Sequence, residues 1–182
     1  MEVTEIHKQL KVAMVQINST VGDLTGNVQK MKKFLDNALK YGADIVIFPE
    51  LAVTGYPPQD LLFEKSFIEE NRRLVNEIIL KNSNEIIIVG FVDQDLNGNL
   101  FNAAAVFQGH NLAGVVYKTL LPTYDVFDED RYFTPNKEED IKPVEVLING
   151  RKLKLGVEIC EDLWTKNTRL KSLTFLLNVE HS

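Results

Sequence analysis

The stretch 43–50, ADIVIFPE, decides the fold, because it is a short continuous apolar run that ends in a carboxylate. Such runs are typical of strands in parallel sheets that are covered on both faces. Another short apolar run, KVAMVQINS from Lys11, is also predicted as a strand. Between them, apolar residues recur at helical spacing from Val28 to Leu39, which predicts a helix that Thr25 caps and Gly42 ends. Strand, helix and strand in this order predict an α/β unit.

The remainder of the chain predicts a second helix and several hairpins. Ser66 and Glu69 have the spacing of a capping box and predict a helix of about 15 residues. EIIIVGF predicts a third strand, which a two-residue turn at Asn97-Gly98 joins to FNAAAVF, and LAGVVY follows as a further strand. A second Asn-Gly pair, at 149–150, joins VEVLI to RKLKLGVEI, which we expect to run as a strand up to Cys160. These elements predict an α/β sheet with helices on at least one face.

The composition excludes several classes of protein. A net charge of -6 and an isoelectric point near 5.1 argue against nucleic-acid binding, which depends on clustered Lys and Arg. No apolar run approaches the roughly 20 residues that span a bilayer, and the polar start lacks the apolar core of a signal peptide, so we expect a cytoplasmic protein without membrane contact. One cysteine and three scattered histidines predict neither a disulfide nor a metal site. The length of 182 residues predicts one domain.

Three chemically capable residues each follow a predicted strand, namely Glu50, Lys118 and Cys160. Functional groups collect at this position in α/β sheets, because the loops begin there. A cysteine attacks as the thiolate, and because no histidine is suitably placed, Glu50 would serve as its general base. Lys118 would stabilise the negative charge that develops on the carbonyl oxygen of an amide. The set predicts amide hydrolysis through a thioester, without a metal or an organic cofactor.

Each of these residues also has an ordinary structural explanation. Free cysteine is among the most buried residue types, so Cys160 fits an inert core thiol. Glu50 fits the cap of a loop or helix start, and Lys118 fits a solvated charge at the end of a strand. The residues alone leave both explanations open.

Three blocks, IVIFPELAVTGYPPQD, VYKTLLPTYDVFDEDRYF and GVEICEDLW, resemble the signature blocks of the nitrilase, or carbon–nitrogen hydrolase, superfamily and occur in the same order. The wording GYPPQDLL, YDVFDEDRYF and CEDLW is similar in particular to the glutaminase domain of glutamine-dependent NAD synthetases. The resemblance implies that Glu50 is the general base, Lys118 the oxyanion-stabilising cation and Cys160 the nucleophile.

The resemblance extends to residues around these three. Glu129 matches the second family glutamate, which positions the lysine and the substrate. Tyr56, Tyr124 and Glu161 match positions that recognise the amino-acid part of glutamine, and the Glu161 carboxylate would pair with its ammonium group. The implied substrate is therefore glutamine or another small amide.

The implied fold is the nitrilase-like αββα sandwich, and proteins of this family tend to form homo-oligomers. The match runs from about residue 10 to Trp164, and the residues that follow depart from the family pattern, so we expect a single partial amidase domain over 1–182, incomplete at its C-terminal end. In the family, the released ammonia passes to a synthetase domain that uses ATP and Mg to amidate deaminated NAD. Because the 182 residues hold no Gly-rich nucleotide-binding loop, that domain is expected to be absent here, and a synthetase domain or subunit is a possible partner.

Two other functions remain open from the sequence. A stand-alone amidase or nitrilase that acts on another small carboxamide or nitrile would show no preference for glutamine. A truncated non-catalytic remnant that acts only in assembly would hold an unreactive Cys160.

Overall fold

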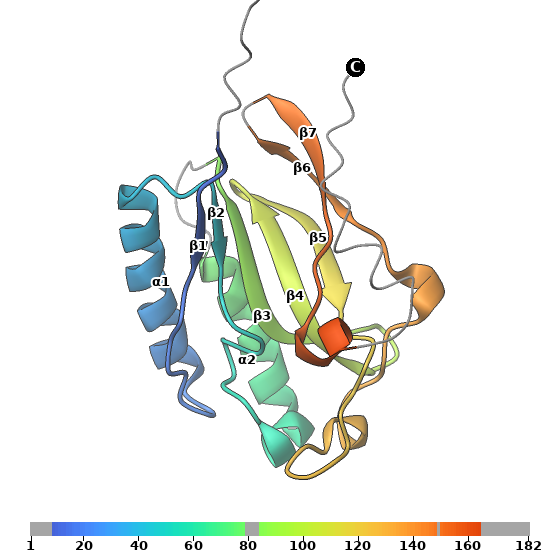
Figure 1. Cartoon of the computed structure of the whole chain (residues 1–182). Coiled ribbons are helices and arrows are strands. Elements are labelled where there is room, and N and C mark those ends of the chain that lie inside the picture. The colour runs from blue at the N-terminus through green and yellow to red at the C-terminus, as the bar shows by residue number, and fades with distance from the viewer. Residues whose placement is uncertain (1–8, 79–83, 149, 165–182) are drawn as a thin grey trace, which may run out of the picture.

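A computed structural model describes residues 9–78, 84–148 and 150–164, which form a layered α/β structure (Figure 1). The strands of the central sheet are β1 Val12–Met14, β2 Ile45–Ile47, β3 Ile86–Gln94, β4 Leu100–Gln108 and β5 Asn111–Tyr117. They lie in the order β1-β2-β3-β4-β5. β1, β2 and β3 are parallel neighbours, whereas β3, β4 and β5 form consecutive antiparallel pairs. The predicted order of strands and hairpins is therefore confirmed.

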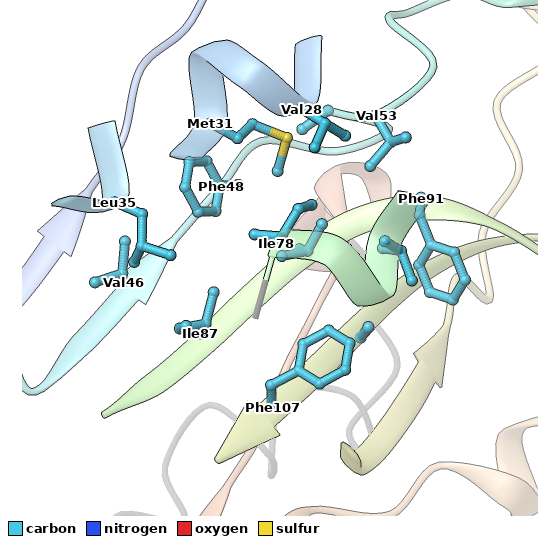
Figure 2. Packing of buried hydrophobic residues seen from close by; sticks show 14 of the residues in the cluster. Val28, Met31, Leu35, Val46, Phe48, Val53, Ile78, Ile87, Phe91 and Phe107 are labelled. Atoms are coloured by element: carbon cyan, nitrogen blue, oxygen red, sulfur yellow. The ribbon is translucent and has the colours of Figure 1, made fainter. Parts of the chain in front are cut away.

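Two α-helices, α1 Leu24–Lys40 and α2 Lys65–Val75, cover one face of this sheet (Figure 1). Successive side chains of a strand lie on opposite faces, so alternate residues of β3 and β4 point towards the helices. Figure 2 shows the resulting buried cluster, which includes Val28, Met31, Leu35, Val46, Phe48, Val53, Ile78, Ile87, Phe91 and Phe107. Burial of these apolar groups fixes both helices to the sheet.

A second sheet covers the opposite face and consists of β6 Val144–Ile148 and β7 Arg151–Leu155. The other set of alternating side chains of β3 and β4 packs against it, in a cluster of Ile86, Ile88, Ala104, Val106, Val144, Val146, Ile148, Leu153 and Leu155. Gly114 of β5 allows close contact, because a Cβ atom there would lie 3.1 Å from the methyl groups of Val144. The remaining residues of β6 and β7 are exposed, namely Glu145, Leu147, Arg151, Lys152 and Lys154.

The helix layer and the two sheets correspond to the first three layers of the expected αββα sandwich, and the expected α/β fold is confirmed. The predicted incompleteness at the C-terminal end concerns residues beyond 164, which lie outside the described residues. The described loops also contain 3₁₀ helices, namely η1 Gln59–Phe63, η2 Asn76–Ile78, η3 Glu129–Arg131, η4 Glu138–Asp140 and η5 Cys160–Trp164.

The first helix ends as predicted but begins differently. Gly42 has the positive φ of +72° that a left-handed helix stop requires. The cap, however, is Asp23 and not Thr25, because the Asp23 carboxylate accepts a hydrogen bond from the Gly26 N–H at 2.9 Å. Thr25 is already inside the helix.

The second helix does not use the predicted capping box. It begins at Lys65 with Glu64 as the N-cap residue, and no side chain caps it, so Ser66 lies within the first turn. Glu69 instead forms an exposed ion pair with Lys65 at 3.5 Å. The α-helix has 11 residues rather than about 15, and a 3₁₀ turn continues it to Ile78.

The two Asn-Gly hairpins differ in length. Gln94 pairs with Leu100, so residues 95–99 form the first connection, which is longer than the predicted two-residue turn. The Asp95 carboxylate closes it by accepting hydrogen bonds from the N–H groups of Asn97 and Asn99. In the second hairpin Ile148 pairs with Arg151, as expected for a two-residue turn, although Asn149 lies outside the described residues.

The prediction that one strand runs up to Cys160 is wrong. β7 ends at Leu155, which pairs with Val144, the first residue of β6. The residue before Val144 is Pro143, which has no N–H with which to extend the ladder. Residues 156–159 therefore leave the sheet, and Cys160 begins η5.

A glycine in β3 allows the loop after β2 to pass close to the sheet. A Cβ atom on Gly90 would lie 2.3 Å from the carbonyl oxygen of Pro49 and 2.5 Å from the backbone nitrogen of Leu51. The Val53 N–H also donates to the Gly90 carbonyl at 3.3 Å. Because Glu50 lies between Pro49 and Leu51, Gly90 determines how close Glu50 lies to β3.

We predict that Gly90→Ala destabilises the protein, because the added methyl group collides with backbone atoms that cannot rotate away. The expected loss in the free energy of unfolding is about 1–3 kcal/mol, measured by urea denaturation. Gly114→Ala is the matched control, since its methyl group meets only the side chain of Val144. An equal loss in both variants would contradict the prediction.

Candidate active site

Lys118 is a buried charge that directly follows β5. Its side chain is 0% exposed although β5 is the edge strand of the sheet. Its backbone N–H donates to the Asn102 carbonyl at 2.9 Å, and its carbonyl accepts from the Asn136 N–H at 2.9 Å. Lys118 is therefore held from both sides, and the alternative of a solvated charge at a strand end is wrong.

Two glutamates hold the ammonium group of Lys118. Its Nζ lies 2.7 Å from Oε1 of Glu50 and 2.9 and 2.8 Å from Oε1 and Oε2 of Glu129. Burial alone lowers the pKa of Lys118, but the charges and hydrogen bonds of Glu50 and Glu129 outweigh it and raise the pKa above its ordinary value. Lys118 therefore stays protonated at neutral pH and provides a fixed cation.

Glu129 is the more enclosed of the two carboxylates. Its side chain is 5% exposed, compared with 20% for Glu50. The Tyr56 hydroxyl donates to Glu129 Oε1 at 2.9 Å. Burial raises the pKa of Glu129 despite the opposing effect of Lys118, and burial and the Glu129 carboxylate together raise the pKa of Tyr56. The structure thus joins Tyr56, a predicted substrate-binding residue, to the buried side of the site.

Asn102 is a contact that the motifs do not reveal. It belongs to β4, is 1% exposed, and donates from Nδ2 to Glu50 Oε1 at 2.7 Å. Lys118 uses the same oxygen, so neither donor occupies Oε2 of Glu50. The signal in the sequence is a single amide in the otherwise apolar FNAAAVF. A buried amide in a strand requires a polar partner, and here the partner is Glu50.

Cys160 is the first residue of η5 and lies on the cavity beside Glu50. Its backbone φ is +48°, a left-handed conformation that is uncommon for residues other than glycine and is often found at functional sites. The residue is exposed and lines, together with Glu50 and Gly90, a cavity of about 230 Å³. The expectation that Cys160 is buried in the core is therefore wrong.

The thiol of Cys160 is electrostatically coupled to the two charged neighbours. Partial burial and then the charge of Glu50 raise its pKa above the ordinary value, whereas Lys118 lowers it. At neutral pH Cys160 is thus mainly a thiol and needs a base to become a nucleophile. Glu50, which lines the same cavity as Cys160, is positioned to accept its proton.

Tyr124 and Glu161 form a second and more exposed pair. The Tyr124 hydroxyl donates to Oε2 of Glu161 at 2.9 Å, and Tyr124 is 54% exposed. The ring of Tyr124 meets Phe127 edge-on at 5.6 Å, and Phe127 lies 6.3 Å from the ring of Tyr56. These aromatic contacts link the exposed pair to the buried group around Lys118.

The part of the chain that the structure describes contains neither a metal-binding cluster nor a membrane-spanning helix. Within residues 9–78, 84–148 and 150–164, no group of three or more His, Cys, Asp or Glu side chains could hold a metal ion. No helix among these residues is long and apolar enough to cross a membrane.

We predict that Lys118→Met lowers the free energy of unfolding by about 3–5 kcal/mol at neutral pH, because it leaves the buried Glu129 and the neighbouring Glu50 without their cation. Burial raises the pKa of Glu129, and protonation removes its uncompensated charge, so the loss should become smaller as the pH falls. Urea denaturation at neutral and mildly acidic pH measures both effects. The exposed Lys154→Met is the control, and a loss that grows in acid would contradict the prediction.

We further predict that Glu50→Gln lowers the pKa of the Cys160 thiol, because it removes the neighbouring negative charge and leaves the positive charge of Lys118. The measurement is the alkylation rate of Cys160 by iodoacetamide across a pH series. Cys160 is the single cysteine of the chain, so the signal has one source. The midpoint should move to lower pH in Glu50→Gln and stay in place in the exposed control Asp140→Asn.

Comparison with known proteins identifies the family. The family described as Carbon-nitrogen hydrolase matches residues 11–174. The chain is 40% identical over 159 residues to the glutamine-dependent NAD(+) synthetase of Thermotoga maritima, which covers 86% of this chain and 26% of that protein. It is also 40% identical over 174 residues to the Acinetobacter baylyi protein of the same name, covering 95% of this chain and 30% of that protein.

A solved structure agrees with these relatives. Glutamine-dependent NAD+ synthetase from Acinetobacter baumannii, in complex with ADP, matches with a TM-score of 0.79 and 34% identity over 92% of this chain and 30% of that chain. The chain thus spans less than a third of the length of these relatives. The resemblance drawn from the three motif blocks is confirmed, and the chain belongs to the carbon–nitrogen hydrolase family.

Proposed function

We propose that this chain hydrolyses the side-chain amide of glutamine and releases ammonia. The observation that carries the proposal is the buried Lys118, held by Glu50 and Glu129 beside the cavity that Cys160 lines. The similarity to glutamine-dependent NAD(+) synthetases supports glutamine as the substrate.

In the proposed first half-reaction, Cys160 attacks the carboxamide carbon. Glu50 takes the thiol proton as the carbon–sulfur bond forms, and Lys118 stabilises the negative charge on the former carbonyl oxygen. When the tetrahedral intermediate collapses, the carbon–nitrogen bond breaks and Glu50 returns the proton to the leaving nitrogen. The products are ammonia and a γ-glutamyl thioester on Cys160.

In the second half-reaction, water replaces ammonia. Glu50 takes a proton from the water, which attacks the thioester carbon, and the second tetrahedral intermediate is again stabilised by Lys118. Its collapse releases glutamate, and the sulfur of Cys160 recovers the proton from Glu50. Lys118 stays protonated throughout, and Glu129 holds it in place. None of these steps requires a metal ion or an organic cofactor.

Tyr124 and Glu161 are the proposed recognition pair for the amino-acid part of glutamine. Glu161 would bind the ammonium group directly, and the hydroxyl of Tyr124 orients the Glu161 carboxylate. Tyr56 would contribute the apolar edge of its ring while its hydroxyl remains bonded to Glu129.

We also propose the fate of the ammonia from the names of the relatives. It would pass to a synthetase domain or subunit that amidates deaminated NAD, and ATP and Mg would be needed only there. A homo-oligomer would be the expected assembly, as the family resemblance implies.

We predict that the protein releases ammonia from glutamine in preference to propionamide and propionitrile, and that Cys160→Ala lowers the rate at least about a thousandfold. Hydroxylamine should divert the thioester to γ-glutamyl hydroxamate, which a colour reaction with ferric ion detects. Asp140→Asn, which alters an exposed carboxylate in η4, is the control with unchanged rates.

The result separates this proposal from the two alternatives. Equal turnover of the small amides or nitriles would favour a stand-alone amidase or nitrilase. Ammonia release that survives Cys160→Ala would contradict the proposed role of Cys160 as the nucleophile. The absence of both ammonia release and hydroxamate in the unaltered protein would favour a non-catalytic role in assembly.

A further inference from the structure

Asp162 is a buried carboxylate that bonds to the flanks of two proposed catalytic residues. It lies in η5, is 3% exposed, and follows Cys160 by one intervening residue. Its Oδ1 accepts hydrogen bonds from the N–H groups of Thr119 at 3.1 Å and Leu120 at 2.8 Å. Its Oδ2 accepts from the N–H of Ile159 at 3.3 Å and also from the N–H of Thr119 at 3.4 Å.

The backbone donors to Asp162 lie next to Lys118 and Cys160 in the sequence. Thr119 and Leu120 directly follow Lys118, and Ile159 directly precedes Cys160. One carboxylate therefore ties the chain that leaves Lys118 to the turn that presents Cys160, because Oδ1 accepts from Leu120 and Oδ2 accepts from Ile159. Figure 1 shows the short helix at the end of the described chain beside the segment that follows β5.

The choice of a carboxylate at this position is energetically unfavourable by itself. Burial raises the pKa of Asp162, against the opposing effects of the three backbone N–H groups and of Lys118. Both oxygens of the Asp162 carboxylate accept backbone hydrogen bonds, whereas the side-chain amide of an asparagine has one acceptor oxygen. The contact between the two segments therefore uses both acceptor oxygens of Asp162.

The turn at Cys160 needs such a restraint. Its left-handed φ of +48° is an uncommon conformation, which persists only where the surrounding structure holds it in place. Asp162 supplies a contact on the residue before Cys160 and belongs to the helical turn after it. Both sides of the strained residue are thus tied to the segment of Lys118.

We propose that Asp162 is a positioning residue that sets the distance between the Cys160 thiol and the Glu50–Lys118 group. This inference rests on the proposed function, since it assigns Asp162 a role in the reaction of Cys160. Asp162 does not contact the substrate, and it acts through the backbone on either side of Cys160 and Lys118. A displacement of the thiol by about 1 Å is enough to slow such a reaction about a hundredfold.

The decisive variant is Asp162→Asn, which keeps the shape of the side chain but has one acceptor oxygen. The test measures how far Glu50→Gln moves the alkylation midpoint of Cys160, first in the unaltered protein and then in Asp162→Asn and Asp162→Ala. We expect the movement to shrink to less than half in both, because the thiol leaves its place beside Glu50. The control Asp140→Asn should retain the full movement.

A kinetic measurement separates positioning from general loss of structure. With glutamine as substrate, Asp162→Asn should lower kcat about 10- to 100-fold and change KM by a smaller factor, since Asp162 itself is not proposed to contact glutamine. The kinetic measurement is made without urea, and urea denaturation shows separately that each variant is folded under the assay conditions. A variant that retains both the full Glu50-dependent movement and the original kcat overturns the proposal.

Hydrogen exchange distinguishes a failure of the inference about Asp162 from a failure of the proposed function. The amides of Thr119, Leu120 and Ile159 should exchange faster in Asp162→Ala, whether or not the chain hydrolyses glutamine. Unchanged exchange at both segments overturns the inference about Asp162. If the segments loosen but Glu50→Gln never moves the Cys160 midpoint, the link between the segments is supported and the role of Glu50 in the proposed function is what fails.

Discussion

The buried ammonium group of Lys118 is the constraint on which the rest of the site depends. A charge that is fully removed from water is tolerated only where opposite charges and hydrogen bonds replace the lost solvation. Glu50 and Glu129 provide these partners, the first from a loop 68 residues before Lys118 and the second from η3, 11 residues after it. The protein can bury Lys118 only when the loop after β2, the end of β5 and η3 have all reached their final positions. The folded state and the assembled site are therefore formed together.

The sheet supplies the geometry that this charge requires. The parallel pair of β2 and β3 brings the loop that carries Glu50 to the same edge as the end of β5. Gly90 lets this loop approach β3 closely, and Asn102 on the neighbouring strand β4 fixes the Glu50 carboxylate. The clusters on the two faces of the sheet keep these strands in register, because a slip by one residue would exchange the two sets of side chains.

The sequence predicted the features that depend on local patterns and missed those that depend on distant contacts. Apolar runs and Asn-Gly pairs located the strands and hairpins correctly, and a glycine marked the end of α1. The end of β7 was missed, because it depends on Pro143, the residue that precedes the partner strand β6. Asn102 and Asp162 were missed for a related reason, since their partners are 52 and 42 or 43 residues away. The motifs gave Glu50, Lys118, Glu129 and Cys160 as candidates, and only the structure brings them to one place.

The surroundings of the two glutamates explain why they can have different roles. Both carboxylates contact the same ammonium group, but Glu129 is nearly enclosed and receives donors on both oxygens from Lys118 and Tyr56. Glu50 is more exposed, lines the cavity beside Cys160, and receives Lys118 and Asn102 on Oε1 alone. A carboxylate can exchange a proton with a substrate only through an oxygen that is accessible and not already saturated with donors. By this criterion Glu50 is suited to carry protons, and Glu129 is suited to keep Lys118 charged and still.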